Sequence, residues 1–98
     1  MRRDEVIARL KQVEPTVRAL GARSLYLYGS HARDEAGLAS DVDVFIDKEP
    51  GRPFGLPEFM EIYFKLRDVL GVEVGYTTRE GLVEFYRPHI EREAIRVF

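Results

Sequence analysis

The fold is decided by two short stretches, Tyr28-Gly29-Ser30-His31-Ala32-Arg33 and Ser40-Asp41-Val42-Asp43-Val44. The first begins where an aromatic and apolar run over 24–28 ends, and this run predicts a buried strand followed by a glycine turn. The second alternates acidic and apolar residues, which also predicts a strand. Because successive strand residues point to opposite faces, Asp41 and Asp43 project from the same face, about 7 Å apart along the chain. The two stretches therefore place a turn and a pair of carboxylates on adjacent strands.

Helical patterns surround these strands. Proline at first-turn positions and glycine at stops mark the helix ends. The patterns predict a helix over 4–13 that restarts near Pro15 and stops at Gly21, and a short helix after Ser30. After a loop over 47–55, they predict a helix over 57–70, another over 79–86 and a final helix from Pro88. The predicted strands cover 24–28, 41–46 and 72–76. We expect an α/β domain with a small mixed sheet covered by helices, chiefly on one face.

Length and composition exclude several classes of protein. The 98 residues are 45% hydrophobic and carry 15 Lys and Arg against 17 Asp and Glu, which predicts one folded domain over 1–98. The absence of cysteine excludes a disulfide framework and a cysteine-ligated metal site. The near balance of charge argues against direct nucleic-acid binding. No run approaches the roughly 20 apolar residues of a membrane span, and we expect a cytoplasmic protein without a secretory signal.

The paired carboxylates suggest a metal site. Two carboxylates this close repel each other, and a divalent cation removes the repulsion, because Mg²⁺ takes carboxylate, phosphate and water oxygens. The alternative is that Asp41 and Asp43 stand at the solvated start of a strand. Glu73, between Val72 and Val74, is the candidate third acid, because an acid in an apolar strand is costly unless it faces water or binds something. An outward position on an amphipathic strand explains Glu73 equally well.

The Gly-Ser turn has features that suit an anion. Gly29 lets the backbone approach a ligand closely, and the helix N-terminus after it offers unpaired N–H groups. Ser30 adds a hydroxyl donor, and Arg33 adds a guanidinium that can contact phosphate through two N–H groups. The alternative is an ordinary strand–turn–helix with Ser30 as its cap. We expect His31 in this turn to be exposed to solvent. Together with the carboxylates, the turn indicates a nucleoside-triphosphate site.

These residues resemble the signature of the minimal nucleotidyltransferases of the DNA polymerase β superfamily. The signature combines a Gly-Ser turn, an Ala-Arg pair and a Ser-Asp-x-Asp strand, and the resemblance covers most of the chain. It implies the polymerase-β-like nucleotidyltransferase fold. It also implies that Gly29 and Ser30 hold the nucleotide phosphates, with Arg33 and Ser40 as further nucleotide-binding residues.

The resemblance further implies a catalytic role for the acids. Asp41 and Asp43, completed by Glu73, would bind two Mg²⁺ and act in the transfer of AMP from ATP to a hydroxyl, with release of pyrophosphate. The sequence departs from the family at two positions: Asp34 stands where glycine is common, and Glu73 is one methylene longer than the usual aspartate. These departures favour the alternative of a catalytically weak or inactive module that neutralises its partner by binding.

The resemblance also suggests a partner. Related single-domain proteins are often encoded beside a HEPN-type protein, which implies an antitoxin that adenylylates a tyrosine of a HEPN-type toxin within a hetero-oligomer. Met60 and Phe64 lie off the main apolar face of the helix over 57–70, where a partner surface or two singly exposed side chains would explain them. A third hypothesis is a small-molecule nucleotidyltransferase, which would need an additional acceptor-binding subunit.

Overall fold

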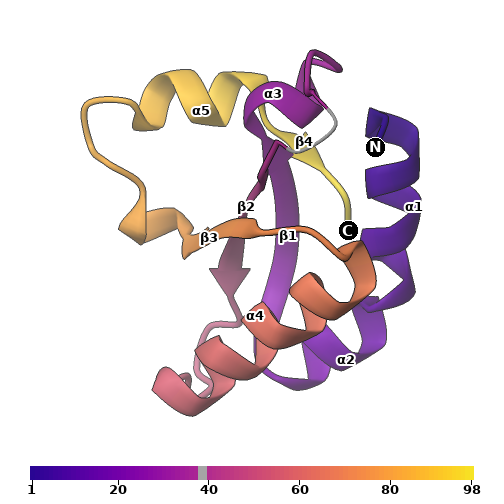
Figure 1. Ribbon diagram of the computed structural model, residues 1–98. Coiled ribbons are helices and arrows are strands. Elements are labelled where there is room, and N and C mark those ends of the chain that lie inside the picture. The colour runs from indigo at the N-terminus through magenta and orange to yellow at the C-terminus, as the bar shows by residue number, and fades with distance from the viewer. Residues whose placement is uncertain (38–39) are drawn as a thin grey trace.

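Four strands form a single mixed sheet in the computed structural model, which describes residues 1–37 and 40–98 (Figure 1). The strands are β1 (Ala22–Tyr28), β2 (Val42–Lys48), β3 (Val74–Thr78) and β4 (Ile95–Arg96), in the spatial order β3-β2-β1-β4. β2 runs antiparallel to β1 and parallel to β3, and β4 pairs antiparallel with the other edge of β1. The predicted α/β class with a mixed sheet is confirmed.

One face of the sheet packs against three helices, α1 (Arg3–Gln12), α2 (Glu14–Ala19) and α4 (Leu56–Leu70). Strand alternation brings every second residue of β2, namely Val42, Val44 and Ile46, to this face, and the helices contribute apolar residues three or four apart. Fully buried members of this core include Val6, Leu10, Leu25, Leu27, Val42, Val44, Ile46, Ile62 and Leu66. The core fixes β2, and with it the acidic residues at its start. No helix within the described ranges is both long and apolar enough to cross a membrane.

The opposite face of the sheet is only partly covered. The chain turns through α3 (Gly29–Ala32) at the end of β1, and the 3-10 turn η1 (Arg79–Gly81) leads toward α5 (Arg87–Glu93). Figure 1 shows α5, in yellow, on the other side of the sheet from α1 and α2. The expectation of helices on one face therefore describes α1, α2 and α4, and α5 is the exception.

A single arginine fastens this second layer to the sheet. Phe45 is fully buried on the α5 side and stacks on Tyr26, with ring centroids 4.8 Å apart. The Arg79 guanidinium lies 4.8 Å from the Phe45 centroid and 4.9 Å from the Tyr26 centroid. It donates to both carboxylate oxygens of Asp47 in β2 and to Glu91 in α5. One side chain thus links η1, β2 and α5.

Two segments predicted as helical differ in the structure. The segment 79–86 forms only the η1 turn, in which the Thr78 hydroxyl accepts a hydrogen bond from the Gly81 N–H at 3.2 Å. The final helix ends at Glu93, and Ile95 pairs with β1 as part of β4. β-Branched side chains fit the pleated surface of a sheet. The apolar residues after Glu93 therefore extend the sheet instead of continuing a helix.

Candidate functional site

The two aspartates predicted as ligands lie at the start of β2. Asp41 precedes the strand and is exposed, whereas Asp43 is half-buried and pairs with Tyr28 in β1 and with Gly75 in β3. The residues on either side of Asp43, Val42 and Val44, belong to the core. Because side chains alternate along a strand, the Asp43 carboxylate projects from the opposite face of the sheet, the one that α5 partly covers.

The Asp43 carboxylate lies between two glycines. A Cβ atom built on Gly29 would lie 2.6 Å from one carboxylate oxygen, and a Cβ atom built on Gly75 would lie closer still to the other. A side chain at either position would therefore displace the carboxylate. Gly29 also has a φ of +75°, where L side chains are strained. The two glycines create room around Asp43 where the turn meets β2 and β3.

The negative charge of Asp43 is poorly compensated within the fold. Burial raises the pKa of its carboxyl, and Asp41 raises it further, while His31 and Arg33 lower it in part. Within residues 1–37 and 40–98, no hydrogen bond lowers this pKa. A divalent cation would offset the repulsion between the aspartates, because hard cations take carboxylate oxygens and are completed by phosphate and water. The two aspartates and the space between the glycines fit such an ion.

Glu73 does not join Asp41 and Asp43 as the sequence predicted. It lies just before β3, and its carboxylate accepts a hydrogen bond from the Tyr63 hydroxyl at 2.5 Å, with Arg67 3.8 Å away. Both partners belong to α4, on the core side of the sheet. Throughout residues 1–37 and 40–98, no three acidic or histidine side chains are grouped so that they could hold a metal ion. The β3 residue that faces Asp43 is instead a glycine.

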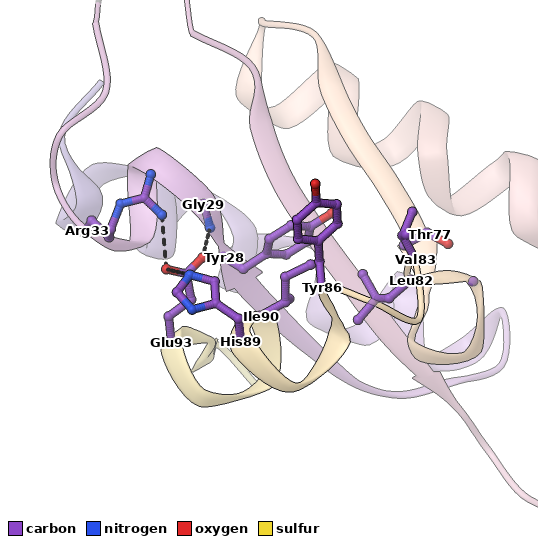
Figure 2. Close-up of a pocket in the computed structure, with 11 residues that line it drawn as sticks. Tyr28, Gly29, Arg33, Thr77, Leu82, Val83, Tyr86, His89, Ile90 and Glu93 are labelled. Atoms are coloured by element: carbon purple, nitrogen blue, oxygen red, sulfur yellow. Dashed lines mark hydrogen bonds and ion pairs between the residues drawn. The ribbon is translucent and has the colours of Figure 1, made fainter.

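The Gly-Ser turn is held by a residue that sequence reasoning missed. Glu93, in α5, accepts a hydrogen bond from the Gly29 N–H at 3.1 Å with one carboxylate oxygen and from Arg33 Nη1 at 2.9 Å with the other (Figure 2). Arg33 also donates to Glu35 at 3.2 Å, so the guanidinium predicted for phosphate is already paired. It remains accessible, since 44% of its side chain is exposed. Gly29 and Glu93 are 64 residues apart, and no local pattern connects them.

Two other residues near the turn make structural contacts. The prediction that His31 is exposed is wrong: its side chain is 2% exposed, and Nδ1 donates to the backbone carbonyl of Asp41 at 3.1 Å. This bond ties α3 to the start of β2. Ser40, predicted as a nucleotide-binding residue, accepts a hydrogen bond from the Gly37 N–H at 3.0 Å through its Oγ. In this structure its hydroxyl holds the loop before β2.

Asp34 points away from the turn. It has a φ of +58°, a backbone conformation that glycine adopts freely and that aspartate adopts more readily than most other residues. Its Oδ1 accepts a hydrogen bond from the backbone N–H of Arg3 at 3.0 Å, and Arg2 lies 3.9 Å from Oδ2. The charge of Asp34 is thus directed to the start of α1, where a negative charge is favourable.

A cavity of about 370 Å³ opens beside the turn, next to α5 (Figure 2). Its apolar lining includes Leu82, Val83 and Ile90, and its charged end is formed by Arg33, His89 and Glu93. Tyr28 also lines the cavity, and its pKa is raised first by burial and then by the charge of Asp43. The cavity therefore adjoins the turn, whose Gly29 lies against Asp43, and its volume lies within the range of small-molecule sites.

Comparison with known proteins assigns this arrangement to a family. The family model described as the nucleotidyltransferase domain matches residues 9–97, a range that contains the Gly-Ser turn, both aspartates and Glu93. The chain belongs to this family. A solved structure described as a candidate minimal nucleotidyltransferase is 33% identical, with a TM-score of 0.81 over 97% of this chain and 95% of that chain. The minimal nucleotidyltransferase predicted from the motifs is thereby confirmed.

Two archaeal relatives extend the comparison, both from Methanocaldococcus jannaschii and both named as candidate protein adenylyltransferases. One is 26% identical over 87 residues, covering 89% of this chain and 91% of the relative. The other is 30% identical over 70 residues, covering 71% of this chain and 66% of the relative. A toxin–antitoxin structure with AMP-PNP aligns over all of this chain and 73% of that chain with a TM-score of 0.67 and 15% identity, which is a likeness of fold alone.

Proposed function

We propose that this nucleotidyltransferase transfers AMP from ATP to a hydroxyl group of a partner protein, in the presence of Mg²⁺. The observation that carries the proposal is the contact between Asp43 and Gly29, which brings the cation ligands and the phosphate turn to one point. The relatives named as protein adenylyltransferases support a protein acceptor. The toxin–antitoxin neighbour with AMP-PNP supports an adenine nucleotide and a toxin as the partner. A toxin of the HEPN type, with a tyrosine as the acceptor, is what the sequence resemblance adds to the proposal.

The chain's own residues have separable roles in this proposal. Asp41 and Asp43 supply carboxylate oxygens to a divalent cation, and the Ser30 hydroxyl donates to a phosphate at the Gly29 turn. Arg33, partly exposed beside the turn, adds positive charge near the triphosphate. A bound Mg²⁺ would neutralise charge on the triphosphate and orient it for in-line attack. Because the structure brings two acids together and not three, the proposal assigns ligands from this chain to one cation.

The test is transfer of label from α-³²P-ATP to a purified HEPN-type protein, with Mg²⁺ present. Asp41→Asn and Asp43→Asn should each reduce labelling by about a hundredfold or more, because each removes a charge that stabilises the transferring group. Asp68→Asn is the matched control, since Asp68 is exposed on α4, away from the turn. Absence of label with the unaltered protein, or full labelling with Asp43→Asn, would contradict the proposed transfer.

A second candidate function is neutralisation of the partner by binding alone. It is favoured by one observation: the Glu73 carboxylate is hydrogen-bonded to Tyr63 of α4, and the β3 residue opposite Asp43 is Gly75. Within the part of the chain that the structure describes, no third acid joins Asp41 and Asp43. Growth assays with the co-expressed partner separate the two functions. If protection survives Asp43→Asn, binding is sufficient; if protection and labelling are lost together, transfer is required.

A further inference from the structure

We infer that Glu93 is a positioning residue for the nucleotide: its carboxylate holds the Gly29–Arg33 turn in the shape that receives the triphosphate. This inference rests on the proposed function, because it assigns the turn to phosphate. Glu93 lies in α5, the helix on the far side of the cavity from the core, and reaches back to the end of β1. The proposed chemistry does not use it.

The contacts of Glu93 converge on the turn from one side. Its Oε1 accepts from the Gly29 N–H at 3.1 Å, and its Oε2 accepts from Arg33 Nη1 at 2.9 Å (Figure 2). His89, one helical turn earlier, places Nε2 3.7 Å from Oε2. The Glu93 side chain is 16% exposed, in contrast to Glu35, the other acidic partner of Arg33, which is 66% exposed. Glu93 is thus the sheltered anchor of this turn.

Gly29 is held from both sides. Asp43 lies so close on one side that no side chain fits at Gly29. On the other side, the Glu93 carboxylate accepts a hydrogen bond from the Gly29 N–H. Without Glu93, this partly buried N–H loses its acceptor, and among the residues that the structure describes Arg33 keeps the exposed partner Glu35. Fewer contacts then hold the Gly29 backbone at its φ of +75°. A looser turn presents the Ser30 hydroxyl less accurately to a phosphate, which weakens binding.

The opposite role, in which Glu93 competes with phosphate for the same donors, is less consistent with these contacts. The Glu93 charge is paired with Arg33 at 2.9 Å, so little of it is left to repel an anion. The Glu93 hydrogen bonds go to Gly29 and Arg33, not to the Ser30 hydroxyl. Arg33 remains 44% exposed in the presence of Glu93 and can still meet a phosphate from the solvent side.

The test compares Glu93→Ala with Glu93→Gln, which keeps an oxygen for the Gly29 N–H. Hydrogen exchange of the Gly29 amide is followed by NMR, and Mg²⁺-dependent binding of AMP-PNP is followed by calorimetry. In Glu93→Ala we expect about tenfold faster exchange, the effect of the hydrogen bond lost by the Gly29 N–H, and binding weaker by at least about tenfold, because the Arg33 contact is lost as well. Glu93→Gln keeps the acceptor for the Gly29 N–H but loses the ion pair with Arg33, so its losses should be smaller than those of Glu93→Ala in both measurements. Glu35→Gln is the matched control and should change neither.

The outcomes decide between the roles. Unchanged Gly29 exchange in Glu93→Ala, or AMP-PNP binding that is equal or tighter, overturns the positioning role, and tighter binding identifies Glu93 as a competitor. If Glu93→Ala does not fold, Glu93→Asp, whose carboxylate is one methylene short of Gly29, takes its place with the same expected direction. If the unaltered protein binds no AMP-PNP, the proposed function fails. The exchange rate of the Gly29 amide in Glu93→Ala then still shows whether Glu93 holds the turn.

Discussion

Replacing Asp43 with asparagine should stabilise the protein when no metal is present. Burial and the neighbouring Asp41 raise the pKa of Asp43, and no hydrogen bond favours its ionised form. A carboxyl whose pKa is raised by folding lowers stability as pH rises from its unfolded pKa through its folded pKa. At neutral pH the penalty is fully present, and Asp43→Asn removes it while keeping the shape of the side chain.

The part of the effect that comes from Asp41 follows from the separation of the two carboxylates, and burial of Asp43 acts in the same direction. Residues two apart in a strand are about 7 Å apart, and two like charges at that distance repel by about 0.6 kcal/mol in a medium as polar as water. The water value applies because Asp41 is exposed and Asp43 only half-buried. For a domain of this size, such a change raises the unfolding temperature by about 2–5 °C.

The assay is thermal unfolding with EDTA, and again with Mg²⁺ and AMP-PNP. With EDTA at pH 7, Asp43→Asn should unfold at a higher temperature than the unaltered protein, and this gap should shrink as pH falls through the raised pKa of Asp43 toward the ordinary pKa of an aspartate. With Mg²⁺ and AMP-PNP the order should reverse, because only the unaltered protein gains stability from the ligand. Asp68→Asn should follow the unaltered protein throughout. A lower unfolding temperature for Asp43→Asn in EDTA would refute the reasoning.

Three further substitutions test other parts of the structure. Gly75→Ala should reduce Mg²⁺-dependent AMP-PNP binding by about tenfold or more in calorimetry, because its Cβ displaces the Asp43 carboxylate; unchanged binding would contradict the site. Arg79→Met should lower the free energy of unfolding in urea by about 2 kcal/mol at pH 7. Because Arg79 holds the pKa of Asp47 below its usual value, this loss should shrink as pH falls through that pKa, and a constant loss would argue against the ion pair. Glu73→Gln should leave label transfer within about twofold, and a large loss would place Glu73 in catalysis.

The parts of the fold that local patterns encode could be predicted from the sequence. β2 and the turn before it follow from the alternation of Asp41 and Asp43 with valines and from Gly29 after an aromatic run. The long helix α4 begins near Pro57 and is followed by Gly71, as the sequence indicated. In each of these elements, neighbouring residues carry the whole signal.

The features that the sequence did not predict depend on contacts between residues far apart in the chain. Whether Glu73 faces Asp43 is set by the register between β3 and β2, and the observed register places Gly75 opposite Asp43. The burial of His31 depends on the Asp41 carbonyl, ten residues along the chain, as its hydrogen-bond partner. β4 exists only because β1 offers it a free edge. No local pattern contains these pairings.

The hydrogen bond between Glu93 and Gly29 has a consequence for folding during translation. The N-terminal part of a chain emerges from the ribosome first, so the turn and the aspartates appear well before α5. Gly29 and Glu93 are 64 residues apart. An unfinished chain thus has the acids and the turn but lacks the anchor that joins them to the last helix. With Glu93 in the proposed positioning role, the turn gains its full order, and its full affinity for a nucleotide, once translation has passed that helix.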